Sequence, residues 1–151
     1  MLEEIPVQEI LKTPLKRGGE FADLFFEESR SIVIVCEEDR IEKVERMGVA
    51  REKIILDPGI GFGKTVSHNL LILKHLTEFG VLGRPILVGT SRKSFIGSIL
   101  NRDLEKRLWG TLATAVIGCW NGAHIVRVHD VMEAKDALRM AEAIRKVEFT
   151  L

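Results

Sequence analysis

Short apolar runs recur along this chain, and each run leads directly into a polar turn. The three runs are Ile54 to Leu56, Ile86 to Val88 and Ile125 to Val128. They are rich in β-branched residues and nearly continuous, which is typical of parallel strands buried on both faces. Asp57, Lys93 and His129, in the turns that follow, stand 36 residues apart. This spacing predicts repeated strand-plus-helix units with their chemistry at one end.

The segments between the runs have the apolar period of helices, which parallel strands need as crossovers. We expect Ser67 to cap the first helix and Gly80 to end it, with an apolar face of Leu70, Leu73, Leu76 and Phe79. A second helix is expected between Asp103 and Asn121, and Trp109 and Trp120 are expected to pack within it. The third is expected to open at Asp130 with an apolar face of Val131, Ala134, Leu138, Ala141 and Ile144. We therefore predict an α/β fold.

The first third of the chain carries weaker signals. We expect a loop over 12–20 and a helix from about residue 21, and residues 1–20 are poorly defined within a single domain of 1–151. The segment IVIVC, residues 32–36, has strand propensity but runs without a turn signal into EEDRIEKVERMG. Strand and helix are both open there, and we expect a helix that stops at Gly48.

Length and charge bound the class of protein. With 151 residues the chain is short for a complete barrel of about 250 residues, so half a barrel or an open sheet is predicted. Residues 1–47 carry 12 acids and 7 bases, while 48–151 carry 10 acids and 15 bases. This modest basic excess favours an anionic small molecule and is too weak for nucleic acid. Without an apolar run near 18 residues or a CxxC pair, we predict a cytoplasmic protein without membrane insertion.

The glycine-rich turn DPGIGFGKT, residues 57–65, matches neither common nucleotide-binding loop. Pro58 stands where a phosphate-binding loop requires glycine, and Lys64 stands where a dinucleotide fingerprint requires it. What remains is a carboxylate at a strand end, followed by glycines that let a ligand approach the backbone. Asp57 can accept paired N–H donors from a heterocycle, or it can simply cap the loop.

Two further turns carry cations at strand ends. Arg92 and Lys93 are adjacent and repel each other unless an anionic or carbonyl-rich group lies between them; alternatively both point into solvent. Arg127 and His129 lie on the same side of a strand because strand side chains alternate. Such a pair suits phosphate oxygens, so the sequence predicts an anion site.

Three long motifs in this order, DPGIGFGKTVSHN, GTSRKSFIG and RLWGTLATAVIGCWNGAHIVRVHDV, resemble the carboxy-terminal half of dihydropteroate synthase over residues 40–145. The resemblance implies a partial TIM (β/α)₈ barrel. It also implies condensation of 6-hydroxymethyl-7,8-dihydropterin pyrophosphate with para-aminobenzoate, giving dihydropteroate and pyrophosphate. In that family, the matching positions make Asp57 and Lys93 the catalytic and pterin-contacting residues. They place Phe62, Ser91 and Arg92 in the aminobenzoate pocket and Arg127 and His129 on the pyrophosphate.

The resemblance also implies parts that this sequence does not supply. The family's amino-terminal half brings further strands and an asparagine that binds Mg²⁺, and we find no metal ligand in this chain. We expect either a homodimer or a complex with a missing amino-terminal half, because a half barrel has open sheet edges. Alternative functions are a non-catalytic pterin- or anion-binding subunit and a methyltetrahydrofolate–corrinoid methyltransferase-like domain.

Overall fold

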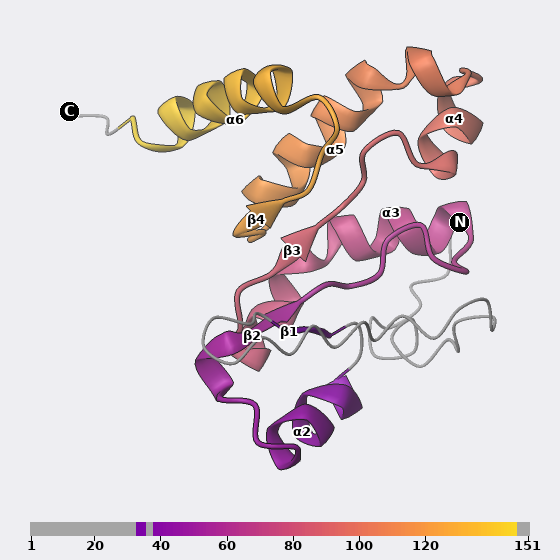
Figure 1. The fold of residues 1–151 in the computed structure, drawn as a ribbon. Coiled ribbons are helices and arrows are strands. Elements are labelled where there is room, and N and C mark those ends of the chain that lie inside the picture. The colour runs from indigo at the N-terminus through magenta and orange to yellow at the C-terminus, as the bar shows by residue number, and fades with distance from the viewer. Residues whose placement is uncertain (1–32, 36–37, 148–151) are drawn as a thin grey trace.

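The computed structural model describes residues 33–35 and 38–147 as alternating strands and helices (Figure 1). The strands are β1 (Val33–Val35), β2 (Ile54–Leu56), β3 (Leu87–Val88) and β4 (Ile125–Val126). The α-helices are α2 (Glu38–Arg46), α3 (Val66–Lys74), α4 (Ser94–Leu100), α5 (Leu108–Trp120) and α6 (Val131–Arg145). Short 3₁₀ helices cover Arg51–Lys53, Leu76–Leu82 and Leu104–Lys106.

The strands pair in parallel and in chain order. β1 pairs with β2, and β3 pairs with β4. A parallel bridge between Leu56 and Ile86 joins the two pairs, and the N–H of Leu56 donates to the carbonyl of Pro85 at 2.9 Å. Because each strand is followed by at least one helix, the described residues form a partial α/β barrel, as predicted.

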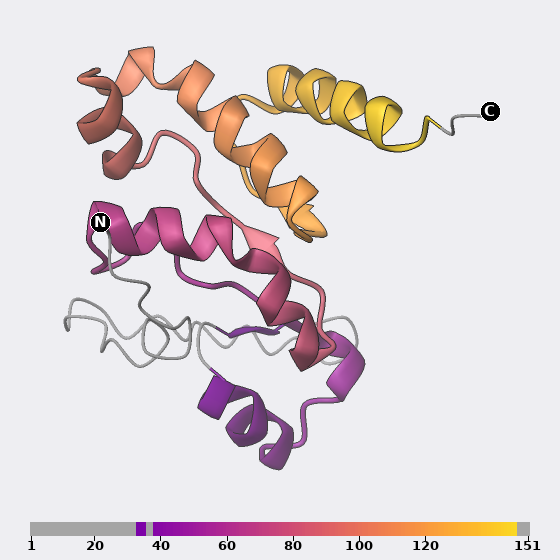
Figure 2. The ribbon, with the colours of Figure 1, turned by 180° about the vertical axis from the view of Figure 1, so that it is seen from behind.

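The core lies between the middle strands and helix α3. Every residue of β2 and β3 is buried. They pack with the large apolar side chains of the following helices, chiefly Ile72, Leu76, Phe79 and Phe95. Seen from behind, α3 and α5 lie in front of the sheet, with β3 visible between them (Figure 2). This packing explains the continuous apolar runs, because neither face of these strands meets solvent.

The expected helix over residues 32–36 is wrong, because residues 33–35 form strand β1. Val33 pairs with Ile54, and Val35 pairs with Leu56. Parallel pairing with a buried strand decides the conformation, since local propensity is weaker than tertiary contacts. Helix α2 begins only at Glu38. The loop and helix expected over 12–28, and Cys36, lie outside the described residues.

Helix α3 differs from the expectation at both ends. Thr65, not Ser67, is its N-cap, and the Thr65 hydroxyl accepts the N–H of His68 at 3.2 Å. The helix ends at Lys74, and the following 3₁₀ helix continues past Gly80 to a left-handed residue, Gly83, at φ 61°. The tighter 3₁₀ turn shifts the apolar face.

The residues predicted to bury that face divide accordingly. Leu73, Leu76 and Phe79 are buried as expected, whereas Leu70 is 43% exposed and Ile72 is buried in its place.

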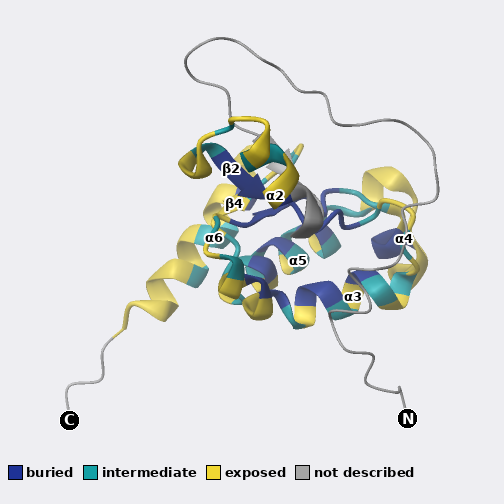
Figure 3. Ribbon diagram, turned by 90° about the horizontal axis from the view of Figure 1, so that it is seen from below, coloured by how far each residue is buried: buried dark blue, intermediate teal, exposed yellow. Residues whose placement is uncertain are grey.

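Helices α5 and α6 pack against each other and leave much apolar surface uncovered. Trp109 and Trp120, which we expected to pack, are 76% and 53% exposed. Ala134 is buried on α6, but Val131 and Ile144 are 60% and 61% exposed. Figure 3 shows α6 exposed along most of its length. Among the described residues, no helix is long and apolar enough to cross a membrane.

Candidate functional site

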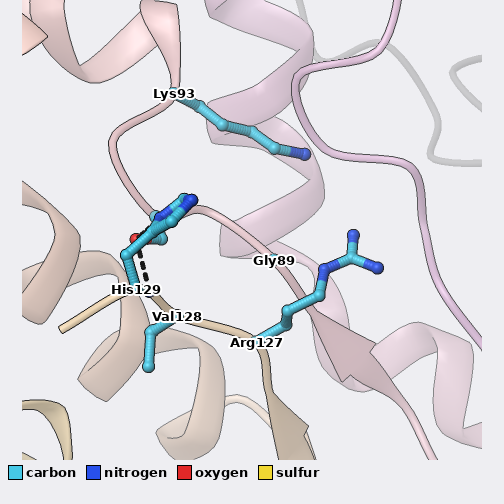
Figure 4. A pocket seen from close by; sticks show the side chains of 6 residues that line it. Gly89, Lys93, Arg127, Val128 and His129 are labelled. Atoms are coloured by element: carbon cyan, nitrogen blue, oxygen red, sulfur yellow. Dashed lines mark hydrogen bonds between the residues drawn. The ribbon is translucent and has the colours of Figure 1, made fainter. Parts of the chain in front are cut away.

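The carboxyl ends of β2, β3 and β4 meet at one edge of the sheet. Asp57 follows β2, Lys93 lies beyond β3, and Arg127 and His129 follow β4. A cavity of about 270 Å³ opens there, and it is lined by Gly89, Ser91, Lys93, Arg127, Val128 and His129. Figure 4 shows these side chains around the end of β3. The three charged turns predicted from the sequence therefore come together.

Each carboxylate oxygen of Asp57 has its own hydrogen-bond partner. Its Oδ1 accepts the N–H of Gly59 at 2.9 Å, which is the capping role considered from the sequence. Its Oδ2 lies 3.3 Å from Arg127 Nη2, an ion pair that spans 70 residues of chain. The residue is only 5% exposed. Asp57 thus holds the glycine loop with one oxygen and presents the other to the cationic side of the site.

The glycine loop is anchored by Asn69, a residue that the sequence analysis did not single out. Asn69 is 2% exposed; its Oδ1 accepts the N–H of Gly61 at 2.6 Å, and its Nδ2 donates to the carbonyl of Thr65 at 2.9 Å. Gly61 has a φ of 82°, which favours glycine. The sequence feature that could have identified Asn69 was an amide side chain near the start of the helix that follows the glycine loop.

Lys93 extends from the β3 turn across this loop. Its Nζ donates to the carbonyl of Ile60, and it lies 4.0 Å from the centre of the Phe62 ring, a cation–π contact. A Cβ at Gly61 would collide with the Lys93 side chain. Glycine is therefore needed at position 61 for two reasons: the backbone is left-handed there, and the Lys93 side chain passes too close to leave room for a Cβ atom.

Arg127 lies across Gly89, another residue that the sequence analysis did not single out. A Cβ at Gly89 would stand 3.0 Å from Arg127 Nη2, tighter than ordinary van der Waals contact. The Arg127 side chain is 53% exposed and reaches from β4 over β3 to Asp57 on the β2 side. The glycine at the end of β3 makes room for this crossing, and the signal in the sequence was its place directly after the apolar run.

Arg92 points away from the cavity. Its guanidinium binds Asp130 through two hydrogen bonds, of 2.5 Å and 3.1 Å. Its backbone is left-handed at φ 54°; the Arg92 N–H donates to Thr111 Oγ1, and Arg107 donates to the Arg92 carbonyl. The adjacent cations Arg92 and Lys93 thus coexist because each has its own partner, whereas we expected one group between them.

The pair with Asp130 shifts both ionisation equilibria. The hydrogen bond from Arg92 and the charge of Arg92 hold the pKa of Asp130 below its ordinary value, against the effect of burial. The hydrogen bond and charge of Asp130 raise the pKa of Arg92. This ion pair joins the β3 turn to the β4 turn.

Ser91 and His129 form a second connection between the same two turns. Ser91 Oγ lies 2.7 Å from His129 Nδ1, and it accepts the backbone N–H of His129 at 3.2 Å. Ser91 is 8% exposed. The resemblance placed Ser91 in the aminobenzoate pocket, and the structure places it beside the predicted anion-binding histidine.

Other histidines lie outside this cavity. His75 Nδ1 is 2.8 Å from Glu78 Oε1, a carboxylate partner that the sequence analysis did not identify. The Nδ1 of His124 accepts the N–H of Ile86 at 3.2 Å, a structural role. Cys119 is a free thiol whose pKa is raised by burial.

Comparison with known proteins identifies the family of this chain. Residues 24–129, which include every candidate site residue, match the family described as pterin binding enzyme. The chain belongs to the pterin binding enzyme family. Over 129 residues this family member is 46% identical to the dihydropteroate synthase of Escherichia coli K12. That match covers 85% of the chain and 44% of the relative, so the chain spans less than half the relative's length.

Solved structures of relatives show the same fold. The dihydropteroate synthase of Yersinia pestis superposes with a TM-score of 0.71 at 44% identity. The match covers 73% of this chain and 52% of the other. The dihydropteroate synthase of Xanthomonas albilineans, solved in complex with 7,8-dihydropteroate, superposes with a TM-score of 0.71 at 38% identity. That match covers 73% of this chain and 44% of the other.

Proposed function

We propose that this chain forms part of a dihydropteroate synthase, and that its three strand ends bind 6-hydroxymethyl-7,8-dihydropterin pyrophosphate. The observation that carries the proposal is the ion pair between Asp57 and Arg127 beside a cavity that Lys93 and His129 also line. A carboxylate and three basic side chains on neighbouring strand ends suit a ligand with an N–H-rich ring at one end and an anion at the other. The names of the relatives support this choice.

The pterin ring would bind at the β2 end. Asp57 Oδ1 accepts one hydrogen bond from Gly59 and keeps a second lone pair, and Oδ2 is paired with Arg127, so both oxygens can accept from a ligand once the guanidinium moves. The paired N–H donors of a pterin ring would take the place of the guanidinium there. The exchange frees Arg127 for the anionic end of the same ligand, so ring and anion binding support each other.

The pyrophosphate would bind at the β4 end. Cleavage of the carbon–oxygen bond leaves negative charge on the departing pyrophosphate and positive charge on the pterin methylene. Arg127, released from Asp57, and His129, held by Ser91, stabilise the first charge. The carboxylate of Asp57, held against the ring, stabilises the second. The neutral amine of para-aminobenzoate can then attack the methylene without a strong base.

Lys93 and Phe62 are in contact at this edge of the sheet; Lys93 would contact the pterin and assist the reacting region, and Phe62 would serve the second substrate. The Lys93 ammonium is fixed by the Ile60 carbonyl and the Phe62 ring, next to the region where the bond breaks. Phe62 is 51% exposed, so its ring is open to an aromatic ligand. Ser91 and Arg92 also match the family's aminobenzoate pocket, and in this structure they hold His129 and Asp130.

Magnesium, which the resemblance implies, does not fit this part of the barrel. Within 33–35 and 38–147, no group of three histidine, cysteine, aspartate or glutamate side chains could hold a metal ion. The two charged residues that line the cavity, Lys93 and Arg127, are cations and would repel a divalent metal ion. The steps above therefore use only this chain's own residues.

We further propose that a second polypeptide, the amino-terminal half of such a barrel or a second copy of this chain, completes the site in the cytoplasm. Strand β4 is a partly exposed edge, and α5 and α6 leave tryptophan and aliphatic side chains uncovered. Open parallel edges invite pairing with another chain. Sedimentation at micromolar concentration should show an assembly, either of this chain alone or of its mixture with an amino-terminal half, and a stable monomer in both samples would contradict this part of the proposal.

Calorimetry with two ligands tests the function. Asp57→Asn keeps an oxygen for Gly59 but weakens acceptance from the pterin ring, so binding of the pterin pyrophosphate should fall about tenfold or more. Binding of inorganic pyrophosphate should remain. Pyrophosphate release, assayed with an amino-terminal half supplied as a separate chain, distinguishes a synthase from a non-catalytic subunit. Equal binding of the pterin pyrophosphate by wild type and Asp57→Asn would refute the site.

A further inference from the structure

The hydrogen bonds between Ser91 and His129 fix more than the position of the ring. Ser91 Oγ accepts the backbone N–H of His129 at 3.2 Å and also lies 2.7 Å from the ring atom Nδ1. One serine therefore contacts the backbone and the side chain of the same histidine. The histidine itself is exposed at the cavity, whereas Ser91 is 8% exposed.

The Ser91 hydroxyl has one hydrogen to donate, and the direction of the ring bond depends on where that hydrogen points. In the described part of the chain, the Ser91 oxygen has one donor, the His129 N–H, and Nδ1 is the acceptor within reach of its hydrogen. A hydroxyl that donates to Nδ1 leaves that nitrogen without a proton. In the neutral ring the proton then sits on Nε2, the nitrogen left to face a ligand in the cavity.

We propose that Ser91 is a positioning residue that holds neutral His129 as the Nε2–H tautomer, so that the ring offers a donor to an anion. The opposite tautomer would present a lone pair to the anion and repel it. The contribution to anion binding rests on the proposed function, but the tautomer itself does not. This role differs from the aminobenzoate contact that the resemblance implies for Ser91.

The neighbouring contacts keep the two residues in register. The next residues along each turn, Arg92 and Asp130, form the ion pair described above. On the other side, the buried Thr90 accepts a hydrogen bond from Thr114 of α5 at 2.9 Å. Ser91 is thus fixed from both sides, so its hydroxyl can direct the ring rather than follow it.

Nitrogen-15 NMR of the ring-labelled full chain tests this at a pH high enough that the ring shifts of His129 no longer change with pH. In wild type, the proton should be found on Nε2 of His129. Ser91→Ala should give a mixture of tautomers, with the shift difference between the two nitrogens reduced by about half or more. Ser91→Thr keeps the hydroxyl and should restore the wild-type pattern. Ser98→Ala, on the exposed face of α4, is the matched control and should change nothing.

A second measurement separates this inference from the proposed function. Ser91→Ala should weaken inorganic pyrophosphate binding by about two- to tenfold, the value of one hydrogen bond. A wild-type proton on Nδ1 would overturn the inference, and this result does not depend on the folding of any variant. Ring shifts that Ser91→Ala leaves unchanged would also overturn it. A changed tautomer with unchanged pyrophosphate affinity would overturn the positioning role. Failure of wild type to bind pyrophosphate would overturn the proposed function, while the ring spectra would still decide the tautomer.

Discussion

Strands β2 and β3 are buried in full beneath α3, whereas β4 exposes Ile125 and carries a helix, α6, that is mostly in contact with solvent (Figure 3). The buried region positions Asp57 and Lys93 by close packing of apolar side chains around their strands. The β4 region positions His129 by polar bonds to Ser91 in the β3 turn, and Arg127 by an ion pair with Asp57 at the end of β2. Two parts of one site are therefore held by different forces, and they should respond differently to substitution.

The largest difference should appear in stability. Ile54 of β2 is fully buried, while Ile125 of β4 is 37% exposed. Ile54→Ala should lower the free energy of unfolding by about 2–5 kcal/mol, because it leaves a cavity in the core. Ile125→Ala should cost less than about 1 kcal/mol. Urea unfolding followed by circular dichroism measures both, and equal losses would show that the two regions do not differ in packing.

The next effect should appear in anion binding. Arg127→Ala should lower the affinity for inorganic pyrophosphate by about 10- to 100-fold, as for a lost hydrogen bond to a charged group. Arg139→Ala removes a cation from the exposed side of α6 and serves as the matched control. Calorimetry would contradict the account if both variants lost the same affinity, since only net charge would then matter.

A smaller effect should appear in the pH dependence of stability. The Asp130 pKa is lowered in the folded protein, so its pair with Arg92 stabilises the fold above the ordinary carboxyl value of about 3.9. This stabilisation is lost as the pH falls from there through the lower, folded-state pKa. Asp130→Asn should lower the melting temperature at pH 7 by less than Ile54→Ala does, and should match wild type at the acid end.

Asp136→Asn, an exposed carboxylate on α6, is the control for that experiment. If the difference in melting temperature between Asp130→Asn and wild type grew on acidification, the effect would be opposite to the one that a lowered Asp130 pKa predicts.

The smallest effect should come from the uncovered aromatic surface. Trp109→Ala should change the free energy of unfolding by no more than about 0.5 kcal/mol, because the side chain is 76% exposed. Phe95→Ala, at a residue 2% exposed, should cost about 3–5 kcal/mol. Denaturant unfolding compares the two. A large loss for Trp109→Ala in the isolated chain would mean that α5 packs against another copy.

The sequence predicted the buried region better than the exposed one. Continuous apolar runs identify β2 and β3, and their ends identify Asp57 and Lys93, because burial on both faces leaves a direct trace in composition. The same reasoning missed β1, where pairing with β2 overrides a local pattern that also suits a helix. It also expected Trp109 to be buried, because a helical apolar pattern does not show whether a packing partner is present.

Within the site, the sequence predicted which charges converge but not how they are held. The bonds of Asn69 to the glycine loop, Arg92 to Asp130 and Ser91 to His129 depend on side-chain direction across segments that fold together only in three dimensions. The glycine at position 89 shows the same limit, since its role depends on Arg127 crossing it.

Amide NMR of the full chain during titration with pyrophosphate shows whether the three strand ends form one ligand site. If they do, the amides of Gly59, Ser91 and His129, one beyond each strand, shift together and give a single dissociation constant. Shifts confined to one strand end, or separate dissociation constants for the three, would contradict it.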